Sequence, residues 1–207
     1  MFFLYILNMT INLKLMMMRR ILTTTIFLGV CLIIGNSVYA RDAFPPGSKL
    51  PPFSIQMPDT PSPEINTYLK VKDGENFSLS QIPARLIVVE FLSVFCAQCQ
   101  VGVPTFNKLY RIMKEDQDLN KDVKMVGIAL LSKADQVVLF KEKFKVRYPL
   151  FADPQDDIQT RTKIYYVPLT LVIDKNNTVL MRHWGKIDDM DAFLIELRRH
   201  LKYQQVQ

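Results

Sequence analysis

The feature that most constrains this chain is a pair of cysteines, Cys96 and Cys99, placed between a strand pattern and a helix pattern. Residues 85–92 (RLIVVEFL) form a nearly continuous apolar run rich in β-branched residues, which is typical of a strand buried on both faces. From residue 97 to about residue 115 the apolar residues recur at a helical period. The sequence therefore predicts a central strand, a short turn and a helix that begins beside the first cysteine.

Similar patterns predict the rest of the fold. Strands are expected at residues 123–131, 148–152, 169–174 and 178–184, and helices at residues 134–144, 155–164 and 190–203. Nearer the N-terminus, residues 66–72 alternate, Asp73-Gly74 is a turn signal and residues 76–80 fit a return strand, which predicts a β-hairpin. This order of elements predicts an α/β fold, a three-layer sandwich with a mixed central sheet.

Residues 1–40 indicate an export segment. They contain three basic residues and no acidic one, then an apolar run, then Val38 and Ala40 as the small residues of a cleavage site. This order is typical of a cleaved signal peptide. The alternative is an uncleaved anchor, because residues 21–40 are just long enough to span a bilayer and would tether the chain to a membrane. Either reading places residues 41–207 in a periplasmic or otherwise extracytoplasmic, oxidising space.

The composition after residue 40 separates an extended lead-in from a folded domain. Residues 41–64 hold seven of the twelve prolines, so they are expected to be irregular, and the domain is expected at residues 65–207. The whole chain has a net charge of +6, of which +3 remains after residue 40. Such a mild excess does not indicate nucleic-acid binding, and the basic run at residues 141–147 is interpreted as a solvated helix end.

An exported chain with two cysteines at this spacing is expected to carry a redox-active dithiol. Cys31 lies in the apolar run and leaves with it if the signal is cleaved. At the start of a helix, free backbone amides and the helix dipole stabilise a thiolate, so Cys96 is the expected nucleophile. Cys99 lies one turn further along, where it would be shielded and would resolve a mixed disulfide.

Three other uses of the cysteine pair stay open. A structural disulfide is one, although a bridge that closes only four residues contributes just about 2 kcal/mol through the unfolded state. A metal site is another, although zinc usually takes four ligands and only His183 and His200 could join the cysteines. Two inert thiols are the third, although an oxidising space favours their oxidation. We expect no metal and no cofactor.

From about residue 47 to residue 202 the chain resembles the thioredoxin superfamily, and specifically the TlpA/ResA-type periplasmic thiol-disulfide oxidoreductases. The resemblance rests on residues 90–99 (EFLSVFCAQC), on Pro104 in the following helix, on residues 166–174 (YVPLTLVID) and on the lead-in residues 50–53 (LPPF). A C-x-x-C alone is moderately specific. A Val-Pro before a buried strand about 70 residues later makes the combination strong.

The resemblance implies a thioredoxin-like fold with an N-terminal hairpin extension, and it implies roles for single residues. Pro168 would be cis and would face the cysteines, so that the backbone of Val167 could pair with a bound cysteine-containing peptide. Glu90 would take the place of the buried acid of thioredoxins, with a pKa raised by burial, and would accept the proton of Cys99. An exposed or lysine-paired Glu90 stays open. Phe95 stands where the family usually has Trp and would keep an apolar lip.

The implied activity is dithiol–disulfide exchange with cysteines of extracytoplasmic proteins, apocytochrome c among them, with a membrane thiol reductase as electron donor. Ala97 and Gln98 give the thiolate no cation, which favours a reductase. One alternative is a peroxiredoxin-like peroxidase, whose P-x-x-x-T-x-x-C motif is matched by Ser93 in place of Thr and broken by Val89 in place of Pro. Another is a copper-binding metallochaperone that would use His183.

Overall fold

The computed structural model describes residues 43–58, 63–72 and 76–204, and from Phe44 onwards they belong to one unit. The export segment predicted at residues 1–40 and the Asp73-Gly74 turn lie outside the described residues. Among the residues that are described, no helix is long and apolar enough to cross a membrane.

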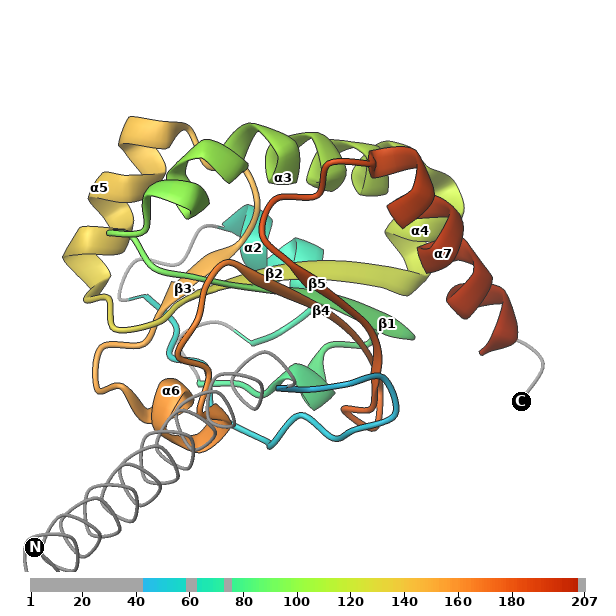
Figure 1. The fold of residues 1–207 in the computed structure, drawn as a ribbon, viewed down its shortest axis with the longest axis horizontal. Helices are drawn as coiled ribbons and strands as arrows, with labels where there is room; N and C mark the ends of the chain where they lie inside the picture. The colour runs from blue at the N-terminus through green and yellow to red at the C-terminus, as the bar shows by residue number, and fades with distance from the viewer. Residues whose placement is uncertain (1–42, 59–62, 73–75, 205–207) are drawn as a thin grey trace, which may run out of the picture. The chain divides into compact units, whose positions relative to one another are not determined.

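Within this part of the chain, five strands form one mixed sheet in the order β3-β2-β1-β4-β5 (Figure 1). The strands are β1 (Leu86–Leu92), β2 (Val123–Ala129), β3 (Leu150–Ala152), β4 (Leu169–Asp174) and β5 (Val179–Trp184). β1, β2 and β3 run parallel to one another, whereas β4 is antiparallel to both of its neighbours, β1 and β5. Every residue of β1, β2 and β4 is buried, as their apolar runs predict.

Helices cover both faces of this sheet. They include α3 (Ala97–Glu115), α4 (Gln117–Asp122), α5 (Ala134–Phe144), α6 (Asp157–Thr162) and α7 (Met190–Tyr203). Figure 1 shows α3 and α7 over one face of the sheet and α6 on the opposite side. The predicted α/β three-layer sandwich with a mixed sheet is confirmed, and the bounds expected for α3, α5 and α7 agree with the structure.

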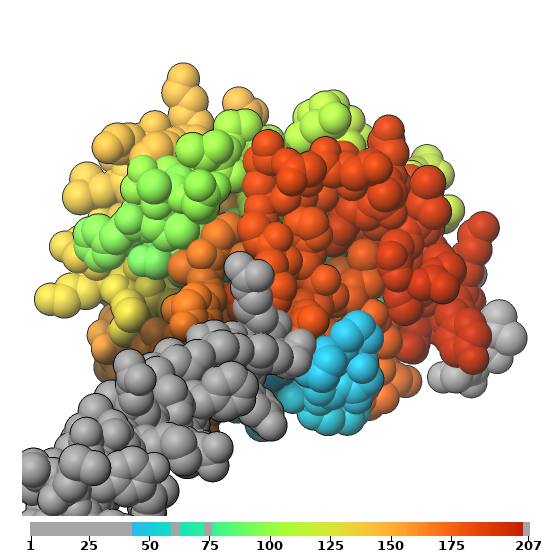
Figure 2. All heavy atoms as spheres, in the orientation of Figure 1, coloured from blue at the N-terminus to red at the C-terminus, as the bar shows by residue number. Residues whose placement is uncertain are grey.

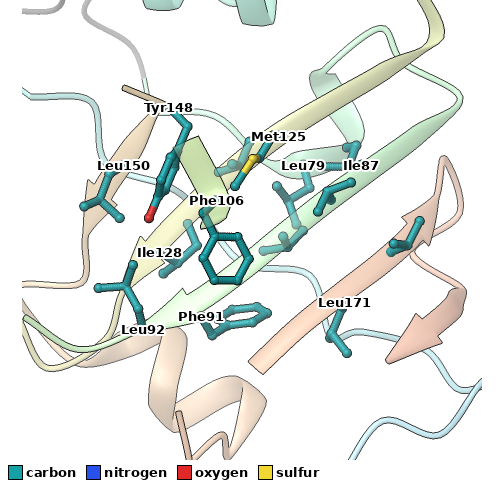
Figure 3. Close-up of a cluster of buried hydrophobic side chains, with 14 of the residues drawn as sticks. Leu79, Ile87, Phe91, Leu92, Phe106, Met125, Ile128, Tyr148, Leu150 and Leu171 are labelled. Atoms are coloured by element: carbon teal, nitrogen blue, oxygen red, sulfur yellow. The ribbon is translucent and has the colours of Figure 1, made fainter. Parts of the chain in front are cut away.

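α3 is held on the sheet by one apolar face. Its buried residues recur every three or four positions, and they include Val103, Phe106, Leu109 and Met113. Phe106 projects from α3 into the same cluster of side chains as Phe91 of β1 (Figure 3). Burying a side chain of this size contributes about 1.5–3 kcal/mol, so this face fixes the helix, and with it the cysteines at its start, against β1.

The strand predicted at residues 66–72 is wrong, because α2 (Pro63–Leu69) occupies this segment. Proline suits the first turn of a helix, where its missing N–H is not needed. Tyr68 and Leu69 are buried on the inner side of α2. The Tyr68 hydroxyl accepts a hydrogen bond of 2.9 Å from the backbone N–H of Met125 in β2. A tertiary contact of this kind is not visible in a local alternation pattern, and it favours the helix.

The second arm of the predicted hairpin is also wrong. Residues 76–80 do not form a strand with residues 66–72; instead Phe77 forms an isolated antiparallel bridge with Ile55 of the lead-in. A short 3-10 helix, η1 (Leu79–Gln81), follows at once. The N-terminal extension is therefore tied together by a bridge between two distant segments, and not by a local β-hairpin.

The short helix α4 has no counterpart in the sequence-based expectation. It begins after Asp116, whose carboxylate accepts a hydrogen bond from the backbone N–H of Leu119 and so caps the helix. The same carboxylate forms an ion pair of 2.7 Å with Arg198 of α7. An Asp three residues before Leu119 was a detectable capping signal, but the six-residue helix is too short to give a periodic pattern.

Candidate active site

Cys96 lies where β1 ends and α3 begins. It is the N-cap residue of α3, and its sulfur accepts a hydrogen bond of 3.2 Å from the backbone N–H of Cys99. The first turn of a helix leaves backbone N–H groups without intrahelical partners, and these groups favour negative charge on an atom beside them. The predicted position of the first cysteine at a helix start is confirmed. The local geometry suits a thiolate.

The two thiols differ sharply in their surroundings. Both are free, but Cys96 is partly exposed whereas Cys99 is fully buried. Burial raises the pKa of Cys99, and the neighbouring Cys96 and Glu90 raise it further. Cys99 therefore stays protonated at neutral pH, and an incoming molecule meets the sulfur of Cys96 first.

A cis peptide bond faces the exposed sulfur. The bond between Val167 and Pro168 is cis, and the Cys96 thiol lies 3.7 Å from the carbonyl oxygen of Val167, to which it donates. In the space-filling view the green start of α3 meets the orange segment that leads into β4 (Figure 2). The predicted cis-proline and its position beside the cysteines are confirmed.

The surface around this sulfur is aromatic. Phe95 is 69% exposed, and Tyr165 and Tyr166, which directly precede Val167, are 68% and 58% exposed. Exposed aromatic residues therefore directly precede both Cys96 and its contact Val167, and such residues suit an apolar partner. Phe95 was predicted from the sequence but the two tyrosines were not, although their position just before the Val-Pro pair was a usable signal.

Glu90 is fully buried in β1, on the same strand that leads to Cys96. Burial raises its pKa to about 8, while the hydroxyl of Tyr148 acts in the opposite direction. Its charge also raises the pKa of Cys99, so the carboxyl and the buried thiol share one environment. The expected burial and raised pKa of Glu90 are confirmed, and the exposed or lysine-paired alternative is not what the structure shows.

The residues considered for a metal site are not brought together. Nε2 of His183 lies 3.0 Å from the carbonyl oxygen of Lys186, in the loop after β5. Among the described residues, no three His, Cys, Asp or Glu side chains gather closely enough to hold a metal ion. His183 therefore does not join Cys96 and Cys99 in a ligand set.

Comparison with known proteins assigns the chain. Residues 46–182 match the AhpC/TSA family. The chain belongs to this family. One curated relative, the thiol-disulfide oxidoreductase ResA of Geobacillus kaustophilus, is 25% identical over 189 residues, which cover 89% of this chain and 95% of the relative. The ResA of Geobacillus thermodenitrificans is 24% identical over 166 residues, 78% of this chain and 84% of that protein.

This AhpC/TSA family member also resembles solved structures. The thioredoxin domain of a thiol-disulfide oxidoreductase from Bacteroides vulgatus superposes with a TM-score of 0.56 at 17% identity, covering 74% of this chain and 98% of that domain. A thiol:disulfide interchange protein from Bacteroides sp. gives 0.56 at 15% identity, covering 77% and 92%. These likenesses establish the thioredoxin-like fold. Together with the ResA relatives they confirm the predicted resemblance to thiol-disulfide oxidoreductases of the thioredoxin superfamily.

Proposed function

We propose that this protein is an exported thiol-disulfide oxidoreductase that reduces disulfides in extracytoplasmic proteins through Cys96 and Cys99. One observation carries the proposal: an exposed sulfur caps α3, a buried thiol lies one turn away, and a cis peptide bond faces the exposed sulfur. The ResA relatives and the export pattern of residues 1–40 support it.

The reaction begins at the exposed sulfur. The Cys96 thiolate attacks one sulfur of a substrate disulfide, which forms a mixed disulfide and releases the other substrate sulfur as a thiolate that takes up a proton. The aromatic lip at Phe95 and the backbone at Val167 and Pro168 receive the substrate segment around its cysteine. Aromatic side chains supply much of the contact energy in such interfaces.

The second step happens inside the protein. Glu90 accepts the proton of Cys99, and the Cys99 thiolate attacks the sulfur of Cys96. The mixed disulfide breaks, a Cys96–Cys99 disulfide forms, and the second substrate cysteine leaves as a thiol. Two electrons pass from the dithiol to the substrate disulfide. A membrane thiol reductase then returns two electrons to the protein.

The residues between the cysteines support the reducing direction of electron flow. A strong oxidant of this fold needs a reduced form in which the thiolate is heavily stabilised. Ala97 and Gln98 carry no charge and add no cation to the Cys96 sulfur. A reduction potential near that of thioredoxin, about −270 mV, is expected, and a value near −120 mV would instead make the protein an oxidant.

Trapping tests the proposal directly. In Cys99→Ser the mixed disulfide cannot be resolved, so covalent complexes with exported proteins should accumulate through Cys96 and disappear on reduction. The control is Cys96→Ser, which should trap nothing. If Cys99→Ser also traps nothing, the proposal is wrong. If the purified dithiol consumes peroxide rapidly without reducing protein disulfides, a peroxidase replaces it.

A further inference from the structure

Glu90 has a neighbouring side chain on only one of the two strands that flank β1. Glu90 pairs with Gly127 of β2 on one side and with Thr170 of β4 on the other. Directly paired residues in a sheet place their side chains on the same face. Gly127 has no side chain, so the position next to the carboxyl on β2 is open to a group from another element.

Tyr148 fills this position. A Cβ atom built on Gly127 would lie 2.9 Å from Cε2 of the Tyr148 ring and 2.8 Å from Leu150, closer than real contacts allow. The backbone N–H of Gly127 donates a 2.7 Å hydrogen bond to the carbonyl of Pro149, which holds this segment against β2. Figure 3 shows the Tyr148 ring inside the core cluster, next to Leu150 and Phe106. The fold therefore uses a glycine in β2 to admit a phenol.

The Tyr148 hydroxyl is buried beside the carboxyl of Glu90. Burial raises the pKa of Tyr148, and the charge of Glu90 raises it further, so the phenol keeps its proton and remains a donor. The titratable groups facing Glu90 are Tyr148, before β3, and Cys99, on α3. Thr170, on β4, adds a neutral hydroxyl.

The polar atoms around Glu90 lack hydrogen-bond partners. Among the described residues, neither oxygen of Glu90 has a hydrogen-bond partner, and the same is true of the hydroxyls of Tyr148 and Thr170. Buried polar atoms in folded proteins are normally paired, so an unpaired set in one place calls for an explanation. Hydrogen bonds at active sites often tighten only when the reaction proceeds. A phenol held beside an acid that gains and loses charge fits this description.

We propose that Tyr148 is a positioning residue for the redox reaction: its hydroxyl orients the Glu90 carboxyl and stabilises its charged form, and Gly127 makes room for it. The inference rests on the proposed role of Glu90 as proton acceptor. In the resolving step one proton passes from the Cys99 sulfur to a carboxylate oxygen of Glu90, and the Cys99 thiolate displaces the substrate sulfur from Cys96. Tyr148 keeps its own proton throughout.

The test separates the two chemical steps in one reaction. The reduced protein reacts with 5,5′-dithiobis(2-nitrobenzoic acid): attack by Cys96 releases a first thionitrobenzoate, and resolution by Cys99 releases a second. In Tyr148→Phe the ring stays and only the hydroxyl is lost. We expect the pH midpoint of the second release to rise by up to about one unit and its rate at pH 7 to fall about three- to tenfold. The first release should keep its rate.

Two comparisons make this result specific. Tyr110→Phe removes a hydroxyl from another buried tyrosine, one that belongs to α3 and packs on Tyr68, and should leave both releases unchanged. In a Glu90→Gln background, Tyr148→Phe should add no further slowing, because the phenol acts through the carboxyl. A merely structural role for Tyr148 would slow both backgrounds alike.

The outcomes that overturn the inference differ from those that overturn the proposed function. An unshifted second release in Tyr148→Phe, with Glu90→Gln slowed, rejects the phenol and keeps Glu90. If Glu90→Gln itself resolves normally, the acid and the phenol are both rejected, while a second release still demonstrates exchange by the dithiol. Failure of the second release in the unaltered protein rejects the dithiol itself.

Discussion

The cysteine edge (residues 93–99 and 165–168) and the N-terminal extension (described residues 43–58, 63–72 and 76–82) are built in opposite ways. At the cysteine edge, a partly exposed sulfur and exposed aromatic rings lie at the ends of two central strands, and the buried carboxyl of Glu90 lies nearby, within β1. The extension presents no such chemistry. It is held by backbone contacts to distant segments, such as the 2.7 Å bond from the N–H of Gly47 to the carbonyl of Val179.

This difference indicates that the cysteine edge determines the chemistry of the protein and that the N-terminal extension contributes to its stability. Beside the cysteine edge the fold retains a buried carboxyl, Glu90, whose burial costs stability and which the proposed mechanism uses. The extension covers sheet positions that would otherwise be left unpaired. Changes in the first region should therefore alter chemistry with little loss of stability, and changes in the second should do the reverse.

Cys96→Ser is the change with the largest expected effect on chemistry. A serine hydroxyl is not ionised near neutral pH and cannot replace the thiolate, so disulfide reduction should fall to the background rate of the assay. The midpoint of thermal unfolding of the reduced protein should shift little, because the residue is partly exposed. Insulin reduction and a melting curve measure the two quantities. A large loss of stability would break the separation between the regions.

Glu90→Gln should remove a large pH dependence of stability. The unfolded chain releases the Glu90 proton near pH 4.5 and the folded protein near pH 8, so the folded state binds more protons in between. The free energy of unfolding therefore falls as the pH rises from about 4.5 to 8, by roughly 4–5 kcal/mol at full extent. Denaturant unfolding at pH 5 and pH 8 should show this fall in the natural sequence and a smaller one in the variant. If the free energy of unfolding changed equally with pH in both proteins, the raised pKa of Glu90 would be contradicted.

Leu69→Ala tests the extension. Leu69 is fully buried on α2, and a leucine-to-alanine change at such a site costs about 2–5 kcal/mol. The rate of the first thionitrobenzoate release should not change, because the cysteines are untouched. The matched control is Ile195→Ala on the exposed side of α7, which should cost less than about 0.5 kcal/mol. Equal losses in both variants would mean that α2 contributes nothing through packing.

Tyr68→Phe should give the smallest effect. β3 pairs with β2 only from Gly127 to Ala129, so the backbone N–H of Met125 uses the Tyr68 hydroxyl instead. Losing this partner leaves a buried N–H unpaired and should cost about 1–3 kcal/mol, with no change in the exchange rate. Hydrogen exchange at Met125 should accelerate in the variant. An unchanged exchange rate at this amide would show that another group had replaced the hydroxyl.

The elements at the cysteine edge could be predicted from the sequence, whereas a helix of the N-terminal extension could not. β1, α3 and the Val167–Pro168 element could be predicted because burial on both faces, a helical period and a motif each depend on nearby residues. α2 could not, because a contact with β2, far along the chain, decides its conformation. Local alternation favoured a strand there, and tertiary structure overrode it.

The surroundings of Glu90 illustrate the limit within the site itself. Its place in a buried strand could be predicted from the apolar run around it. The presence of Tyr148 was not, because it depends on β3 lying next to β2 and on Gly127 leaving space for a ring. Strand order is a property of the whole fold, and no window of the sequence contains it.

The complete burial of Cys99 has a consequence for a captured substrate. Molecules in the surrounding medium can reach the sulfur of Cys96 but not that of Cys99, so under the proposed mechanism Cys99 is oxidised only by its own intramolecular attack on the mixed disulfide. During turnover, the rate of this internal step is set by how readily the buried thiol loses its proton, whereas an external reductant releases the substrate by a separate attack at the mixed disulfide.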